Sequence, residues 1–569
     1  MVIDLNNLSL EEVQLLNDVS IEIKEDFHEL LDVLYNDIDC NIDWLLNSVF
    51  SRNNYLSNVF LDLCYLELIK RTLKVRKVRK VIVGNRAQKL VFTDFCRNYK
   101  LDIIVHCHAS LWSAIKNYSL PFRHILENIL RSIQFLIYKD KKRLIRDFDT
   151  EGITIVDTFL MPSMISNGEY VDRYYNGLTE NLPNKIKKRV YFAPILTHGI
   201  NTSALKTMHE LKNNQFIFNF DYLNLSDYLY AITSPLRILR KRLDHYYFHG
   251  YKITNILKND IYRNIANPSS FQGILTYLFF RRLKLSKVRI ELVIDWFENQ
   301  VVDKGFNKGR SDYYPMTRSI GYEGYIVSNE FYFHHRPTEA EFRNGVIPDK
   351  IAVIGTGLCD DICKYYNPLP VITAPAFRYS KISSVSQTQQ VHKKNRHIIL
   401  AALPVNLNYA KDIICMLNDA LRDEDNNIEK IIVNYHPALN INRLVYLIED
   451  WIDKYDINDE SFSSLIGKID IVVSNSSSTC VESLAYGVPV IIIGSRNGIT
   501  QNPIPDSLPK YMWEICYSVD EFNLALKRLV STIDTKQKSK YDEIARDIRK
   551  NYFEPVTKEG VYRFLELKD

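Results

Sequence analysis

The chain has 569 residues, of which 46% are hydrophobic and 25% are charged, as in ordinary globular proteins. Its length exceeds what one hydrophobic core supports, so we expect two or more domains. The 72 basic residues nearly balance the 68 acidic ones, which argues against nucleic acid as a partner. No apolar run reaches the roughly 18 residues that span a bilayer. The polar start is unlike a secretory signal, and nine scattered cysteines fit a reduced cytoplasm.

The predicted elements of the first 380 residues alternate between helices and strands. The first 75 or so residues read as helical, and Ser9 and Glu12 have the spacing of a capping box. A long helix is expected over about 122–146. Strand-like apolar runs occupy 80–85, 101–108, 152–159, 188–196 and 289–300. This alternation predicts an α/β domain with a largely parallel sheet.

A polar stretch rich in Ser and Gln, 381–396, predicts a linker between two domains. A second α/β unit follows, with strands expected at 397–404, 429–437, 469–474 and 489–494. We therefore predict the α/β class, with two Rossmann-like domains over 1–380 and 397–569 that face a cleft. In open parallel sheets, ligands bind in such a cleft, beyond the carboxyl ends of the strands.

The stretch VVSNSSSTCVESLAYGVPVIIIG, 472–494, places a row of hydroxyls at the end of a predicted strand. A short helix is expected from about residue 478 to 486, ended by Gly487 as the C′ residue. Four hydroxyl residues therefore lie at the helix N-terminus, where free N–H groups favour a phosphate: Ser476, Ser477, Ser478 and Thr479. The alternative is an ordinary helix cap. The signatures of a Walker loop and of a dinucleotide fingerprint are both absent from the sequence.

Two further groups are expected beside the hydroxyls. Glu482 lies about one helical turn after Ser478 and could accept hydrogen bonds from a ribose, or simply face solvent. His436 and Pro437 follow the predicted strand IIVNY, so the imidazole projects toward the same edge of the sheet. Either ring nitrogen could donate to a phosphate or a leaving group, although a lone histidine is more often structural.

These residues carry a resemblance. The HP pair and the downstream SSST…E…YGVPVI pattern are similar to the donor-binding half of GT-B glycosyltransferases, above all those that use CMP-Kdo or CMP-sialic acid. The resemblance implies that the histidine and the hydroxyls hold the CMP phosphate and that Glu482 holds the ribose. It covers about 397–500. It is moderately specific for GT-B, and it distinguishes CMP from UDP or GDP only weakly.

A second resemblance covers about 290–380. The segments IDWFENQVVDKGFNKGRSDYYP and SIGYEGY resemble a family of bacterial surface carbohydrate biosynthesis proteins, a description that carries little mechanism. The chain has Glu323 where glutamine is expected in that family, so we assign this position no role.

The best catalytic candidate in this half is Glu298, which directly follows an apolar strand. Trp296 and Phe297 beside it could raise its pKa into the range of a general acid or base, and Asp295 could share the loop. The alternative is a buried structural glutamate. Asp172, with Arg173, and His198 are weaker candidates. Asp147 and Asp149 follow a basic helix rather than a strand, so no metal site and no cofactor is expected.

The leading prediction is a bacterial GT-B glycosyltransferase that moves Kdo or a related ulosonic acid from a CMP-sugar donor to a growing capsule or O-antigen glycan. The resemblance favours retention of configuration. The helix at 540–553 is expected to cross back to the first domain. A UDP-sugar transferase, a UDP-sugar 2-epimerase and a non-catalytic glycan-binding protein remain alternatives.

Three basic segments, 70–80, 139–146 and 281–289, are either solvated surfaces or contacts with an anionic membrane. We expect a cytoplasmic protein, with peripheral contact at the inner membrane in the second case.

Overall fold

The computed structural model describes the chain apart from a set of short segments. These are 38–40, 52, 54–55, 109–110, 141–150, 161–163, 167–168, 171, 197–204, 206–214, 244, 327, 329–335, 365, 384–395, 424–425, 437–438, 459, 497, 534–537 and 568–569. The sequence candidates His198 and Pro437, most of the predicted linker and most of the basic segment 139–146 therefore lie outside the described residues.

The first large sheet has six parallel strands in the order β13-β12-β11-β10-β4-β7. Their bounds are β4 Ile153–Leu160, β7 Val190–Leu196, β10 Ile290–Trp296, β11 Arg318–Glu323, β12 Lys350–Val353 and β13 Val371–Thr373. The order of the strands reverses between β4 and β10, because β7 extends the sheet one way and β11 the other. Such a switch point opens a crevice at the carboxyl ends of the strands.

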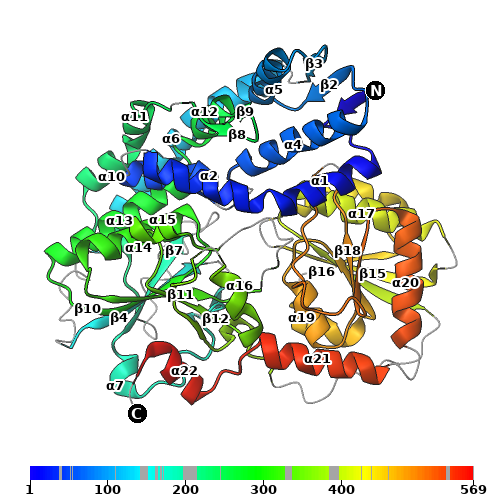
Figure 1. Ribbon diagram of the computed structural model, residues 1–569. Helices are drawn as coiled ribbons and strands as arrows, with labels where there is room; N and C mark the ends of the chain where they lie inside the picture. The colour runs from blue at the N-terminus through cyan, green and yellow to red at the C-terminus, as the bar shows by residue number, and fades with distance from the viewer. Residues whose placement is uncertain are drawn as a thin grey trace.

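The second large sheet also has six parallel strands, in the order β16-β15-β14-β17-β18-β19. Their bounds are β14 His397–Leu403, β15 Ile428–Tyr435, β16 Tyr455–Asn458, β17 Ile471–Ser474, β18 Val490–Ile493 and β19 Trp513–Cys516. Its switch point lies between β14 and β17. The two sheets lie side by side in Figure 1, each with helices packed on its faces.

A third, smaller sheet corrects the prediction for the start of the chain. Residues Val2–Asp4 form a strand, β1, rather than helix, and pair with β2 (Lys80–Val83), which pairs with β3 (Ile104–Cys107). The two strands predicted near 80 and 101 therefore belong to this separate sheet. Helices α1 Leu10–Glu22, α2 Lys24–Asp37, α4 Val59–Val75 and α5 Arg86–Asn98 accompany it across the top of both larger units in Figure 1. The capping box of Ser9 and Glu12 is present at α1.

The end of the chain returns to the first large sheet. Helix α21 (Lys538–Tyr552) packs on α19 (Thr479–Ala485) of the second unit, and the chain then crosses over (Figure 1). The Glu554 amide donates to the Ile354 carbonyl at 2.7 Å, and α22 (Lys558–Leu565) follows. Glu566 pairs with Arg318 at 2.6 Å on the first sheet. The segment thus ties the two units together.

The remaining helices mostly cover the first sheet or the small one. They are α3 Ile42–Leu45, α6 Leu111–Tyr138, α7 Asn184–Lys187, α9 Asn219–Tyr222, α10 Leu225–Ile232, α11 Ser234–Leu239, α12 Thr254–Asn264, α13 Pro268–Leu285, α14 Val301–Tyr313, α15 Glu339–Arg343 and α16 Cys359–Ile362; the second unit adds α17 Leu407–Leu421, α18 Phe462–Leu465 and α20 Val519–Ile533. Two short antiparallel pairs join β5 (Ile165–Ser166) with β6 (Glu169–Tyr170) and β8 (Tyr247–Phe248) with β9 (Tyr251–Lys252). Among the described residues, no helix has the length and hydropathy to cross a bilayer.

The predicted architecture is confirmed: the chain is α/β, with two parallel Rossmann-like sheets whose switch points open to a shared pocket. The domain boundaries at 380 and 397 stay a prediction.

Candidate functional site

One cavity of about 400 Å³ lies between the two large sheets, where both switch points meet. It brings together Glu298, His436 and the stretch from Ser476 to Thr479, all of which the sequence singled out. The other side chains that line it are Asn53, Arg173, Gln300, Tyr325, Ile326, Arg378, Ala402, Leu403, Pro404, Val405, Asn434, Tyr435 and Pro503. The pocket therefore joins carboxyl, imidazole, hydroxyl and guanidinium groups from sequence-distant loops.

The hydroxyl-rich turn exceeds what a helix cap needs. Helix α19 begins at Thr479, and its N-cap residue Ser478 makes no side-chain cap hydrogen bond. The Ser477 hydroxyl instead accepts from the Thr479 amide at 3.3 Å. The hydroxyls of Ser476, Ser478 and Thr479 have no hydrogen-bond partner among the described residues, and they face the pocket. Gly487 follows the helix at a φ of 82°, as its expected C′ position requires.

His436 lies at the tip of β15, as predicted. Its backbone amide donates to the Leu403 carbonyl at 3.0 Å, which fixes the histidine beside the end of β14. His436 is solvent-accessible and lines the pocket. Partial desolvation by the surrounding protein atoms lowers the pKa of its imidazole, and the nearby Arg173 and Arg378 guanidiniums lower it further. The ring is therefore neutral at pH 7, and it offers one N–H donor rather than a charge.

Two arginines supply the positive charge of the pocket. Arg173 follows β4 and Arg378 lies in a short 3₁₀ helix after β13, and both line the cavity. Neither guanidinium has an ion-pair or hydrogen-bond partner in the described part of the chain. Desolvation by the surrounding protein atoms lowers the pKa of Arg173, and the positive charge of Arg378, which lines the same cavity, lowers it further. Arg378 is half-buried and Arg173 is exposed, and guanidiniums without a carboxylate partner favour an anionic ligand.

Sequence reasoning passed over Arg378 and gave Arg173 only a minor place. An isolated arginine in a chain with 72 basic residues carries no local signal. Position gave no clear hint either, since Arg173 follows the short strand Glu169–Tyr170 and Arg378 lies some residues beyond the end of β13.

Glu298 projects from the loop after β10 into the pocket. The Trp296 indole N–H donates to its Oε1 at 2.9 Å, and the Gln300 amide donates to its Oε2. Burial raises the pKa of Glu298, while the Trp296 hydrogen bond, Arg378 and Gln300 oppose that rise. The direction matches the expectation from the apolar wall. The same tryptophan that buries the carboxyl also holds its orientation.

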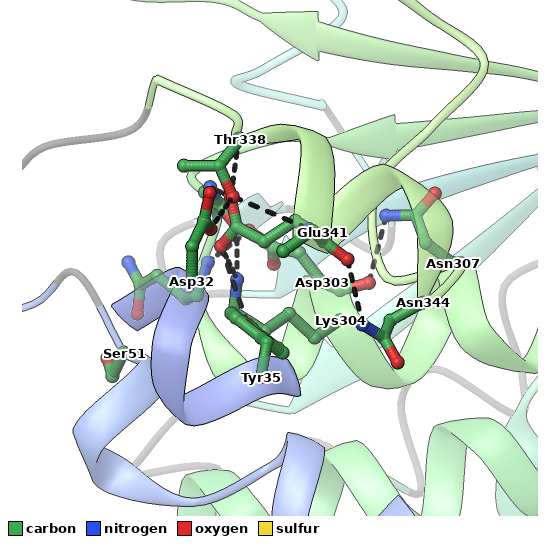
Figure 2. A network of polar contacts seen from close by, with 12 residues as sticks. Asp32, Tyr35, Ser51, Asp303, Lys304, Asn307, Thr338, Glu341 and Asn344 are labelled. Carbon is green, nitrogen blue, oxygen red and sulfur yellow. Dashed lines mark hydrogen bonds and ion pairs between the residues drawn. The ribbon is translucent and has the colours of Figure 1, made fainter. Parts of the chain in front are cut away.

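A buried polar network fixes the backbone behind Glu298. The next residue, Asn299, has a φ of 49°, which non-glycine residues seldom adopt. Its side chain accepts from the Lys304 ammonium and donates to Glu341 Oε2 at 3.1 Å. Lys304 and Glu341, both fully buried, form an ion pair at 2.6 Å. Figure 2 shows this pair, with Thr338 close to Glu341.

Asp295 does not share the loop with Glu298, contrary to the prediction. It belongs to β10, is 0% exposed, and accepts from the Asn307 amide at 2.6 Å. Burial, and then Asp303 and Asp157, raise its pKa well above the usual range. Strand alternation turns it away from the pocket, into a buried cluster of carboxyls behind the site. No group of three or more ligand side chains among the described residues is arranged for a metal ion.

Asp172 also lies outside the pocket lining, and its contacts are structural. Its Oδ1 accepts from the backbone amides of Tyr174 and Tyr175 at 2.7 and 2.8 Å. Its Oδ2 accepts from the Tyr170 hydroxyl at 2.6 Å and the Thr158 hydroxyl at 3.1 Å. With every acceptor site engaged, Asp172 shapes the turn that presents Arg173.

Glu482 is half-buried near the pocket but is not among its lining residues. Burial raises its pKa to about 7, against the opposing effect of Arg378 and Arg173. A role in ribose binding stays a prediction. Glu323, to which no role was assigned, is fully buried at the end of β11, and burial raises its pKa to about 8.

No protein-family model and no curated protein matches the sequence. Solved structures that resemble the fold include S. aureus MnaA with UDP, at 12% identity and a TM-score of 0.41, covering 73% of this chain and 98% of that one. The lipopolysaccharide outer core galactosyltransferase WaaB is 12% identical with a TM-score of 0.41, and the match covers 73% of this chain and 100% of that one. A UDP-N-acetylglucosamine 2-epimerase is 10% identical with a TM-score of 0.38, and the match covers 73% of this chain and 95% of that one. A likeness at this level concerns the fold and says nothing about activity or substrate. The resemblances to CMP-Kdo transferases and to surface carbohydrate proteins gain no support from it.

Proposed function

We propose that the protein is a nucleotide-sugar-dependent glycosyltransferase whose donor binds in the pocket between the two sheets. The observation that carries the proposal is the meeting of unpaired anion-binding groups with a poised carboxylate. Three free hydroxyls and two unpaired guanidiniums face the same 400 Å³ cavity as Glu298. Sugar transfer from a nucleotide needs both: a cradle for the departing phosphate and an acidic residue at the reacting carbon.

The pocket suits a donor with two anionic groups. The hydroxyls of Ser476, Ser478 and Thr479 offer hydrogen bonds to one phosphate. The two guanidiniums, of Arg173 and Arg378, favour a second negative charge. A CMP-linked ulosonic acid such as CMP-Kdo has one phosphate and one sugar carboxylate, and a UDP-sugar has two phosphates. We propose the CMP-ulosonic acid first, on the pattern of the HP and SSST segments, with the UDP-sugar as the second candidate.

The chemistry follows from the charges. When the nucleotide departs, negative charge grows on its phosphate, and fixed guanidiniums in a partly buried site stabilise that charge strongly. The neutral imidazole of His436 can add one hydrogen bond to the same group. Glu298 then acts as the base for the acceptor hydroxyl, with inversion, or as the nucleophile, with retention. We favour retention, and analysis of the product anomer by NMR decides between the two.

The acceptor proposed is a growing bacterial surface glycan, of capsule or O-antigen type, with peripheral contact at a membrane. The first sheet and the small N-terminal unit, which contributes Asn53 to the pocket, would hold it. A 2-epimerase would use the same cleft without any acceptor, so turnover of donor in the absence of glycan would favour that reaction. A non-catalytic binder would show no turnover at all.

The first experiment is thermal unfolding of the purified protein with CMP, UDP, GDP and their sugars. A ligand at about 100 times its Kd adds roughly 2.7 kcal/mol to the stability. We expect a CMP-selective shift that Arg378→Gln and Ser478→Ala each reduce, while Arg528→Gln, at an exposed ion pair remote from the pocket, leaves it intact. A UDP-selective shift would assign a UDP-sugar, rather than a CMP-sugar, as the donor. No shift with any nucleotide would overturn the proposed function.

A further inference from the structure

Helix α6 leaves an apolar stripe exposed, while its inner face buries both apolar and polar side chains, among them Phe135. Between Pro121 and Tyr138 its inner face buries the polar side chains of Asn128 and Ser132, with Asn128 donating to the Ala266 carbonyl at 2.9 Å. Its outer face is apolar. Seven large hydrophobic side chains are exposed there: Phe122, Leu126, Ile129, Leu130, Ile133, Leu136 and Ile137. We call these seven residues the α6 face.

The spacing makes the α6 face one continuous stripe. At 3.6 residues per turn, its members fall within about 120° of the helix circumference. They extend over about 22 Å along the axis at a rise of 1.5 Å per residue. The exposure is large, with Phe122 71% and Leu126 58% accessible. A stripe of this kind is rare on the free surface of a protein, because apolar area in contact with water is unfavourable.

The neighbouring helices add to the apolar surface. Helix α10 contacts α6, and α11 contacts α10. Leu225 and Leu229 are exposed on α10, and Leu236 and Leu239 on α11. Nothing in the described residues covers these side chains.

The charges around the α6 face are positive or neutralised. The carboxylate of Glu127 pairs with Arg123 at 2.8 Å, and that of Asp227 on α10 pairs with Arg282 at 2.7 Å. Directly after α11, Arg240 and Arg242 are exposed and have no ion-pair partner among the described residues. A surface that pairs apolar side chains with unpaired cations is complementary to an anionic bilayer.

We propose that the α6 face docks on an anionic lipid membrane, with helix α6 lying in the plane of the interface. A protein partner would be expected to find hydrogen-bonding groups, about one bond per 100–200 Å² of interface. The α6 face offers none, since all seven side chains are hydrocarbon. Acyl chains need no such groups. The leucines of α10 and α11 would enter the same boundary, and Arg240 and Arg242 would contact the headgroups.

The inference deepens one part of the proposed function, the peripheral membrane contact. Vesicle binding and nucleotide binding can fail separately, because no residue of the α6 face lines the pocket. The test is flotation of the full chain with vesicles of phosphatidylcholine, with and without phosphatidylglycerol. We expect the protein to float with the anionic vesicles. The double variant Leu126→Gln/Leu130→Gln should weaken the partition at least about tenfold, since each change removes apolar area from the interface. Arg240→Gln/Arg242→Gln should weaken it only on anionic vesicles and at low salt.

The matched control is Leu524→Gln on α20, a leucine 71% exposed, as Phe122 is, but far from α6 in the chain. It should leave flotation unchanged. All three variants change exposed side chains, and thermal unfolding confirms that each is folded. The proposal is overturned if the parent protein floats with neither kind of vesicle. It is also overturned if the Leu126→Gln/Leu130→Gln variant floats as well as the parent. A dimer that this variant converts to a monomer, without vesicle binding, would assign the α6 face to contacts between copies of the chain.

Discussion

The two sides of the pocket differ in whether their polar groups are hydrogen-bonded to other protein groups. Behind Glu298, the polar groups satisfy one another: Lys304 pairs with Glu341, and both hold Asn299. Around the hydroxyl turn they are left open, because Ser476 and Ser478 have no side-chain partner among the described residues. A satisfied network fixes geometry, whereas an open set of donors has capacity for a ligand. The comparison assigns positioning to the first side and binding to the second.

The strongest test of the positioning side is Lys304→Met. It leaves the carboxylate of Glu341 buried without its cation, so we expect a loss of about 3–5 kcal/mol in the free energy of unfolding. Urea unfolding measures it. The double variant Lys304→Met/Glu341→Leu removes both charges and should recover much of the loss. If the single variant is as stable as the parent, the network does not hold the loop.

Glu298→Gln tests the carboxylate that this network presents. We expect the transfer rate to fall by about 10²–10⁴-fold while the thermal shift given by nucleotide is retained, because an isosteric amide keeps the pocket but loses the base or nucleophile. In the parent protein, burial raises the pKa of Glu298, so the rate should decline as pH falls through that raised pKa. Asp295→Asn should affect stability more than rate. A Glu298→Gln variant of full activity would refute the assignment.

Some buried oxygens on the satisfied side still lack a partner, and Glu323 carries one of them. It is 1% exposed, its Oε2 has no hydrogen-bond partner in the described chain, and burial raises its pKa to about 8. The folded state therefore binds a proton that the unfolded state releases near pH 4.5, so stability should fall as pH rises from about 4.5 to 8. Glu323→Gln should flatten that decline and gain roughly 2 kcal/mol or more at pH 8. Unfolding curves at pH 5 and pH 8 measure the difference.

The smallest expected effect separates the serines from one another. Ser477→Ala removes the side chain that caps Thr479, at a cost of about 1 kcal/mol in stability. Ser476→Ala removes an open hydroxyl and should leave stability unchanged while it reduces the nucleotide shift. Equal losses of stability in both variants would return the whole turn to the role of a helix cap.

Much of this site was visible in the sequence because its signals are local. A strand ending in hydroxyls, a histidine after an apolar run and a glutamate beside a tryptophan each occupy a few consecutive residues. Parallel sheets place such residues at one edge, so His436, Glu298 and the hydroxyl turn were predicted and do meet in one pocket. The same reasoning gave a wrong position for Asp295. Strand β10 continues to Trp296, so Asp295 is still part of the strand, and the alternation of side chains turns it inward.

The sequence by itself determined the α/β class, the second parallel sheet and the row of hydroxyls, because periodicity and strand-end composition are local properties. Only the tertiary structure decided the third sheet, since β1 pairs with a strand some 78 positions later, at Lys80. It also placed Arg173 and Arg378 in the pocket without an ion-pair partner among the described residues, which is the basis of their proposed role. The exposed face of α6 belongs to the same group. A helical pattern shows that one face is apolar, but only packing decides which face is left toward the outside.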